Sequence, residues 1–240
     1  MSQPTKPLSQ RQRMLTWHIR RHLLFTFEMP SDILAKALPP ELTVFESSPG
    51  LGLLDFGWVD YHPGNFGAGS QGFNELIALI HVPPDLSIDM PVPKMAYYVV
   101  NVGTDSPDFV EREKDTVRTP AHLLPELQVK PDADGLGVTI GDARGTLGRI
   151  RNTHDAPKFG HEKLHVQFYT EQNDALYFGI AEWEGLFFEH QRGGDAGGPQ
   201  QHPFFKNLEL AGVEIEPYHQ MLAQPGGDAY EYFYELERLR

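Results

Sequence analysis

Alternating apolar and polar positions predict short β-strands along most of the chain. The alternation is clear over residues 15–27, where Trp17, Ile19 and Leu23 share one face. Further strands are expected over residues 42–46, 52–61, 72–82, 96–102, 127–129, 137–140, 145–152, 165–170, 175–178, 181–189, 212–216 and 230–236. Strands this short and this frequent are typical of a barrel or of two packed sheets.

Helices are expected to be few and short. Residues 32–38 form one candidate, with Ser31 as its N-cap, and residues 107–114 form another. The 23 glycines and 20 prolines favour turns over long helices. The predicted fold class is therefore mainly β with a few short helices (α+β).

The stretch GFNELIALIHV, residues 72–82, carries a glutamate at its centre. Both faces of this predicted strand are largely apolar, which indicates burial on both sides. A buried carboxylate is costly unless a cation or several donors pair with it, or unless its pKa rises and it keeps its proton. Glu75 is therefore expected to be either a satisfied structural acid or a catalytic one.

Composition limits the class of protein. The chain of 240 residues fits one domain over residues 15–240, preceded by a flexible tail over residues 1–14. The formal net charge of −13 disfavours nucleic acid and anionic membrane surfaces as partners. The sequence shows no charged-then-apolar leader and no apolar run near 18 residues, so a soluble, cytoplasmic protein is expected.

Common catalytic and cofactor motifs are absent from the sequence. It contains no phosphate-binding glycine loop, no dinucleotide fingerprint, no H-E-x-x-H and no G-x-S-x-G. It has no cysteine, and the spacings of its 11 histidines do not match the usual metal ligands. His18 and His22, for example, would share a strand face about 13 Å apart. Neither a metal site nor a cofactor is expected.

Two adjacent arginines, Arg20 and Arg21, lie in the first predicted strand. Adjacent strand residues point in opposite directions, so one of the two can enter the core. Its guanidinium suits a carboxylate, either that of Glu75 or that of a ligand. In the alternative, both arginines lie on the surface.

Several segments, in this order, resemble the acetoacetate decarboxylase-like superfamily. They are HIRRHLLFTFEMPSDILAKALPPEL, GFNEL, YYVVNVGTDSPDFVEREKDTVRTPAH, EWEGLFFEH and HPFFKNLELAGVEI. The resemblance spans about residues 15–235 and implies a closed, cone-shaped β-barrel around a buried pocket. It places Arg20 on the family's active-site arginine and Glu75 on its catalytic glutamate. It also makes a homo-oligomer the default expectation.

The chain departs from this family at its catalytic lysines. The family's Pro-Lys-Lys is replaced by Pro120, Ala121 and His122. Ala121 thus stands where the resemblance implies the Schiff-base lysine, and alanine has no amine to form an imine. Lys94 is the best-placed substitute in the sequence.

The remaining residues suggest acid–base chemistry on a carbonyl compound. Glu75 would move a proton, Arg20 would hold a carboxylate or enolate oxygen, and His122 would donate to a carbonyl oxygen. Tyr61, Tyr97 and Tyr98 would add hydroxyl donors to the pocket. This predicts a lyase-like or isomerase-like enzyme acting on an oxo-acid or a polyketide-like carbonyl compound without a Schiff base. The alternatives are a non-catalytic barrel that binds a small carboxylated ligand through Arg20, and a decarboxylase that uses Lys94.

Overall fold

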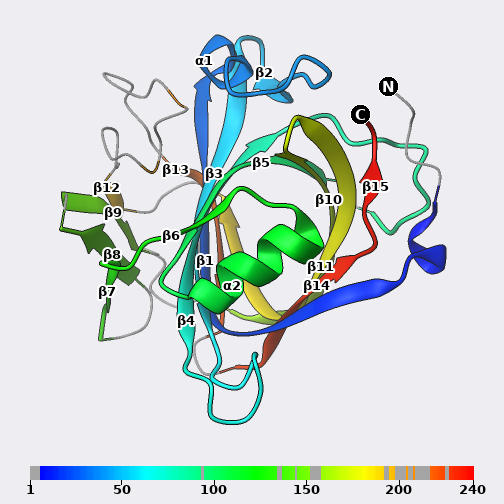
Figure 1. Ribbon diagram of the computed structural model, residues 1–240. Helices are drawn as coiled ribbons and strands as arrows, with labels where there is room; N and C mark the ends of the chain where they lie inside the picture. The colour runs from blue at the N-terminus through cyan, green and yellow to red at the C-terminus, as the bar shows by residue number, and fades with distance from the viewer. Residues whose placement is uncertain are drawn as a thin grey trace.

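The computed structural model describes residues 6–92, 95–133, 137–143, 145–151, 158–191, 195–197, 204, 208, 217–224 and 227–240. Lys94 and the predicted strand over residues 212–216 lie outside them. The described chain is mainly β, as expected (Figure 1). Its strands are β1 (Arg13–Pro30), β2 (Glu46–Ser48), β3 (Leu51–Tyr61), β4 (Phe73–His81), β5 (Met95–Thr104), β6 (Ala121–Leu123), β7 (Gln128–Pro131), β8 (Gly137–Asp142), β9 (Gly145–Arg151), β10 (Gly160–Gln172), β11 (Ala175–Gln191), β12 (Asp195–Gly197), β13 (Pro217–Ala223), β14 (Ala229–Tyr234) and β15 (Glu237–Arg238).

The large sheet has pairings that return to their starting strand. From β1 they run through β14, β11, β10, β5, β4 and β3, and β3 pairs with β1 again. All of these pairs are antiparallel except β5 with β10. We call these strands the ring. A separate sheet has the order β12-β9-β8-β7. The cone-shaped barrel implied by the resemblance stays a prediction.

The two faces of the ring carry separate apolar clusters. The inner cluster includes Trp17, Tyr61, Tyr97 and Trp183. The outer cluster includes Trp58, and it also receives side chains from helix α1 and the small sheet. Adjacent residues on a strand point to opposite faces, so the alternation along each strand decides which side chains reach the interior.

Helix α1 (Ser31–Ala35) begins one residue earlier than predicted. Its N-cap is Pro30, and the Ser31 hydroxyl donates instead to Glu46 Oε1 at 2.7 Å. The prediction that Ser31 is the N-cap is therefore wrong. The other short helical turn, η1, covers Leu8–Gln10.

Helix α2 (Pro107–Arg112) confirms the second predicted helix and continues into a π-helical turn, η2 (Glu113–Val117). The Ser106 side chain caps α2 by accepting the Phe109 N–H at 3.2 Å. Phe109 packs against Trp17 and Tyr61, so α2 covers the inner face of the ring. A π turn shifts the side-chain direction relative to an α-helix, and here it leaves Glu113 buried between exposed neighbours.

Two strand predictions were wrong in their limits. The segments 175–178 and 181–189 form one strand, β11, because Gly179 continues it. A side chain at this glycine would lie 2.3 Å from the Phe168 ring, so close packing requires glycine there. No strand covers residues 42–45, and β2 begins only at Glu46.

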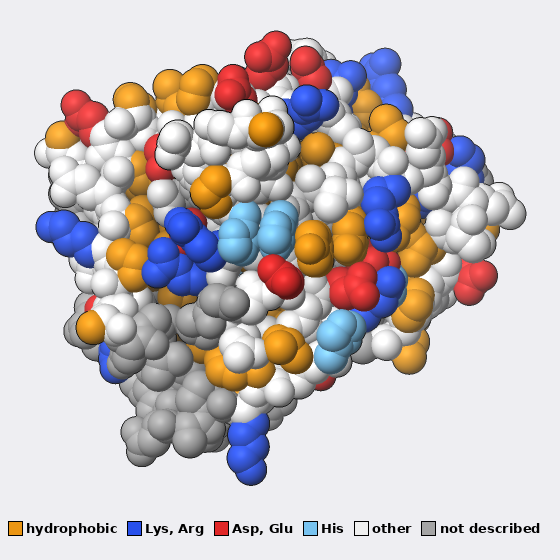
Figure 2. Space-filling model, turned by 90° about the horizontal axis from the view of Figure 1, so that it is seen from below, with side chains coloured by type: hydrophobic (Ala, Val, Ile, Leu, Met, Phe, Trp, Pro, Cys, Tyr) orange, Lys and Arg blue, Asp and Glu red, His pale blue; other side chains and the backbone are white. Residues whose placement is uncertain are grey.

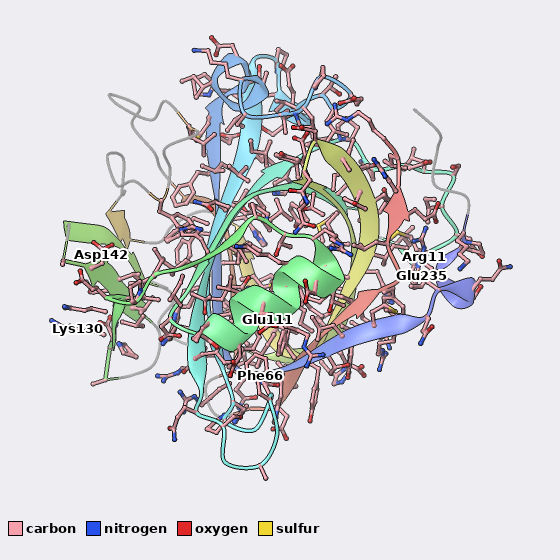
Figure 3. The ribbon with its side chains drawn as sticks, in the orientation of Figure 1. Arg11, Phe66, Glu111, Lys130, Asp142 and Glu235 are labelled. Carbon is pink, nitrogen blue, oxygen red and sulfur yellow. The ribbon has the colours of Figure 1, made fainter. Side chains whose placement is uncertain are left out.

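The segment expected as a tail is described from residue 6 onward. Arg11 is buried, and its guanidinium donates to the backbone oxygen of Glu235 at 2.8 Å (Figure 3). It also pairs with Glu237. No helix in the described part of the chain has the length and apolar character needed to cross a membrane.

Candidate functional site

Glu75 lies on the inner face of β4 and is 5% exposed. The Tyr61 hydroxyl, from the neighbouring strand β3, lies 2.5 Å from Glu75 Oε2. The same hydroxyl lies 3.0 Å from Glu231 Oε2 on β14. Tyr61 has one hydroxyl hydrogen, so the second contact forms a hydrogen bond when one of the two carboxyls carries a proton. Tyr61 thus joins two buried acids from different strands.

Glu231 is held on the inner face of β14. Trp183 Nε1, from β11, donates to Glu231 Oε1 at 2.7 Å. Its two carboxyl oxygens therefore contact Trp183 and Tyr61. Glu231 lies on the buried face of β14, and only 7% of it is exposed.

Glu113 is the third buried acid and comes from the π turn after α2. Trp17 Nε1 donates to its Oε1 at 3.1 Å, and the Thr119 hydroxyl donates to its Oε2 at 2.8 Å. Glu113 is 2% exposed. We call Glu75, Glu113 and Glu231 the acid cluster.

Burial of the acid cluster raises the pKa of every member. For Glu75 the pKa rises well above the usual value, first through burial and then through the charges of Glu231 and Glu113. Burial also raises the pKa of Glu231, and it raises that of Glu113 to about 8. The pKa of Tyr61 likewise rises well above its usual value, mainly through burial. The cluster therefore retains protons near neutral pH, which allows one carboxyl to act as an acid and another as a base.

Two neighbouring hollows lie on the inner face of the ring, and the smaller one adjoins the acid cluster. The inner hollow has a volume of about 30 Å³, and all three acids line it together with Thr119. The outer hollow, of about 380 Å³, is lined by Leu24, Thr26, Leu53, Asp55, His81, Met95, Tyr97, Glu162, Leu164, Trp183, Glu189, His219 and Met221. Tyr97 and Trp183 line both hollows and form the boundary between them. None of the described residues that line either hollow is lysine or arginine.

A second acid–base pair lies in the outer hollow. His81 contacts Asp55 Oδ1 through Nε2 at 2.9 Å, and its ring meets the Tyr97 ring edge-on at 4.6 Å. Asp55 is 1% exposed. This fixes the orientation of His81 at the wall of the larger hollow.

The structure brings together three of the residues that the sequence singled out. Glu75 and Tyr61 share a hydrogen bond, and Tyr97 lines both hollows. Ala121 is 2% exposed and belongs to the same inner cluster as both tyrosines. The position where the resemblance implies a Schiff-base lysine is therefore inside the ring and occupied by a methyl group.

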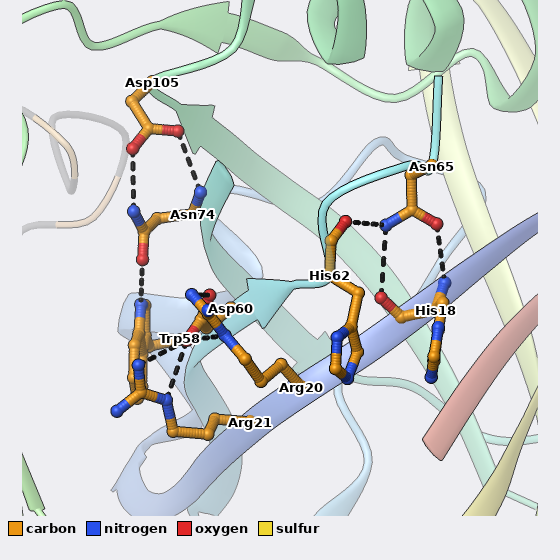
Figure 4. A network of polar contacts seen from close by, with 9 residues as sticks. All are labelled: His18, Arg20, Arg21, Trp58, Asp60, His62, Asn65, Asn74 and Asp105. Atoms are coloured by element: carbon orange, nitrogen blue, oxygen red, sulfur yellow. Dashed lines mark hydrogen bonds and ion pairs between the residues drawn. The ribbon is translucent and has the colours of Figure 1, made fainter. Parts of the chain in front are cut away.

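Arg20 does not join this group. Its guanidinium makes two hydrogen bonds to Asp60, of 2.9 and 2.6 Å, and its side chain is 40% exposed (Figure 4). Arg21 donates to the same carboxylate at 2.7 Å. The pairing of β1 with β3 gains one residue between Ile19 and Arg21, so both arginines reach Asp60 instead of pointing oppositely. The partner expected for Arg20, Glu75, is replaced by Asp60.

His122 and Tyr98 also lie away from the hollows. Ala121 faces inward, so the next residue of β6 faces the other side, where the His122 ring lies 6.1 Å from that of Phe204. Tyr98 belongs to the outer cluster, although its neighbour Tyr97 belongs to the inner one.

Sequence reasoning missed Glu113 and Glu231 as members of the site. Glu231 lies in a segment that alternates aromatic and acidic residues, and this pattern is typical of a half-exposed strand. Glu113 is flanked by charged residues in EREKD, which indicates a solvent-exposed helix. The π turn buries Glu113, and the position of β14 in the ring buries Glu231.

The sequence matches no protein-family model and no curated protein. Solved structures do match. The enduracididine biosynthesis enzyme MppR, in complex with pyruvate, has a TM-score of 0.61 at 12% identity, over 94% of this chain and 90% of that one. Acetoacetate decarboxylase from Legionella pneumophila has a TM-score of 0.60 at 10% identity, over 100% and 92%. An acetoacetate decarboxylase-like enzyme from Sphingomonas wittichii has a TM-score of 0.51 at 13% identity, over 94% and 92%. The protein therefore has the acetoacetate decarboxylase-like fold.

Proposed function

We propose that this protein is a lyase-like or isomerase-like enzyme that moves protons at the carbon next to a carbonyl group of a small uncharged compound, such as a polyketide-like ketone. The observation that carries the proposal is the acid cluster around Tyr61, which adjoins a hollow without a described lysine or arginine in its lining. The reaction proceeds without an imine, because the implied lysine position holds Ala121.

The chemistry uses two protonation states in one cluster. An ionised carboxylate takes the proton from the carbon next to the carbonyl. The electron pair of the broken C–H bond forms the C=C bond of an enol, while the carbonyl oxygen takes a proton from a protonated carboxyl. Glu75 and Glu231 both contact the Tyr61 hydroxyl, which lets a proton pass between them through that oxygen. An elimination or a carbon–carbon cleavage can follow from the same enol.

The charge of the site favours an uncharged substrate over an oxo-acid. The two hollows are lined by the acid cluster and by Asp55, Glu162 and Glu189, with His81 and His219 as the only described groups able to become cationic. A substrate carboxylate would meet Asp55, Glu162 and Glu189 there, with no lysine or arginine among the described lining residues to pair with it. Arg20, the expected anchor for such a carboxylate, is bound to Asp60 instead.

The fold comparisons support carbonyl chemistry in general. One similar structure holds pyruvate, and others are acetoacetate decarboxylases. These relatives share little sequence with this chain, so the choice between an oxo-acid and an uncharged ketone rests on the described side chains.

Enolisation is measured directly by exchange of hydrogens next to the carbonyl with solvent deuterium, followed by proton NMR. A panel of uncharged ketones and lactones is compared with pyruvate and acetoacetate. We expect exchange above the buffer rate for at least one uncharged compound. Glu75→Gln should reduce this exchange at least 100-fold, because positioned acid–base groups contribute roughly 10²–10⁴-fold. Tyr61→Phe should also reduce it, since the link between the two carboxyls is lost.

Tyr98→Phe provides the matched control, because Tyr98 is the neighbour of Tyr97 on the opposite face of β5. It should leave the exchange unchanged. Exchange only with the oxo-acids would contradict the substrate class. Tight binding of a ligand whose hydrogens do not exchange would favour the non-catalytic alternative.

A further inference from the structure

Two histidines and an aspartate converge on the outer face of the ring. His18 is on β1, His62 follows β3, and Asp228 precedes β14. One ligand atom from each lies within 4.8 Å of the others, and His18 Nε2 is 3.0 Å from Asp228 Oδ1. Histidine and acidic side chains also lie side by side near the centre of the face seen in Figure 2.

The two histidines are held in place through their backbones by Asn65. Its side-chain amide donates to the backbone oxygens of His18 at 3.1 Å and of His62 at 2.9 Å (Figure 4). Its Oδ1 accepts the His18 N–H at 2.9 Å. The His18 ring stacks between those of His62, at 4.0 Å, and Tyr230, at 4.7 Å. These contacts hold the two histidines next to each other, and a small rotation of the stacked rings would turn their nitrogens toward one ion.

We propose that His18, His62 and Asp228 form a binding site for a divalent transition-metal ion of the Zn²⁺ class. Two imidazoles and a carboxylate are ligands that zinc accepts, each at about 2.0–2.2 Å from the ion. Two such ligands of one tetrahedral ion lie about 3.3–3.6 Å apart. His18 Nε2 and Asp228 Oδ1, at 3.0 Å, need to separate by only a few tenths of an ångström. The ligand atom of His62, which lies within 4.8 Å of the other two, would have to approach them by little more than an ångström.

The surroundings of His62 suit metal coordination. Its Nε2 is shielded from solvent and has no hydrogen-bond partner among the described residues. The charge of nearby Arg20 is partly offset by Asp60, which also pairs with Arg21.

The proposed metal site lies directly behind the acid cluster. His18 follows Trp17, and His62 follows Tyr61. These neighbours face inward and contact Glu113 or Glu75. A bound ion would therefore link the strands that carry the acid cluster. Its role would be structural, and it would not contact a substrate in the hollows.

The test is calorimetric titration of the tag-free protein, treated with chelator and then dialysed, with Zn²⁺, alongside Co²⁺ absorption spectra. We expect one equivalent to bind with a dissociation constant in the micromolar range or below, and to raise the melting temperature. His62→Gln and Asp228→Asn should each weaken binding at least tenfold. Asp228 has a side chain that is 75% exposed, so its variant is expected to fold normally.

His161→Gln is the matched control, since His161 is an exposed histidine on another strand, β10. It should bind Zn²⁺ like the wild type. The proposal is overturned if no stoichiometric binding is seen, or if both site variants bind Zn²⁺ as tightly as the wild type while circular dichroism shows them folded. Either result leaves the proposed function untouched, because deuterium exchange is measured independently.

Discussion

Replacing Glu113 with glutamine should change how the stability of the protein depends on pH. Burial raises the pKa of Glu113 from 4.5 to about 8. The folded protein therefore keeps a proton that the unfolded chain has lost between these values. Whenever the folded state binds more protons, the free energy of unfolding falls as pH rises, by roughly 1.4 kcal/mol per pH unit for each such group. The free energy of unfolding stops falling once the pH exceeds the pKa of Glu113 in the folded protein.

The useful pH window is set by an opposing group. Burial lowers the pKa of His22 from 6.5 to about 4, so His22 makes the protein more stable as pH rises between these values. Above pH 6.5 this contribution levels off, and the buried acids then dominate the pH dependence among the described buried groups. From pH 6.5 to 8, Glu113 by itself should lower the free energy of unfolding by about 2 kcal/mol.

Glutamine suits the test because it keeps the size of Glu113 and cannot ionise. Its oxygen can accept from Trp17, and its amide can donate to the Thr119 hydroxyl, which replaces both present hydrogen bonds. Urea unfolding, followed by tryptophan fluorescence at several pH values from 6.5 to 8, gives the free energy of unfolding at each. Between pH 6.5 and 8, the free energy of unfolding should fall by about 2 kcal/mol less in Glu113→Gln than in the wild type.

Glu111→Gln is the control, because Glu111 is an exposed residue of α2 (Figure 3). It should show the same decline as the wild type. If Glu113→Gln also declines like the wild type, Glu113 is ionised in the folded protein at neutral pH. The acid–base argument for the acid cluster would then lose its electrostatic basis.

Two further predictions concern the residues that the family resemblance brought forward. Arg20→Gln should leave deuterium exchange of an uncharged ketone unchanged in the NMR assay, because Arg20 binds Asp60 on the outer face of the ring. A tenfold loss of exchange would show that Arg20 acts on the substrate. Borohydride treatment with pyruvate or acetoacetate should produce no mass increase on any lysine, as measured by peptide mass spectrometry. A labelled peptide containing Lys94 would restore imine chemistry and the decarboxylase alternative.

The sequence by itself predicted many of the strands and the burial of Glu75. Alternation along residues 15–27 and the apolar flanks of Glu75 predicted that β1 and β4 are strands. The shared face predicted for Trp17, Ile19 and Leu23 is wrong, because the extra residue after Ile19 places Leu23 in the outer cluster.

Tyr61, Tyr97 and Tyr98 were named together as pocket hydroxyls, and the structure places the first two in the inner cluster and Tyr98 in the outer one. The missing lysine at Ala121 was equally visible in the sequence.

Only the tertiary structure decided which groups meet. Because β1 has one extra residue relative to β3, Arg20 reaches Asp60. Because the turn after α2 is a π turn, the side chain of Glu113 points inward. Glu231 reaches Tyr61 because β14 pairs with β1, which in turn pairs with β3. These contacts join residues far apart in the chain, and local periodicity carries no information on such pairings. A one-residue change of register reverses every face assignment beyond it, so partners of buried acids follow from the assembled ring alone.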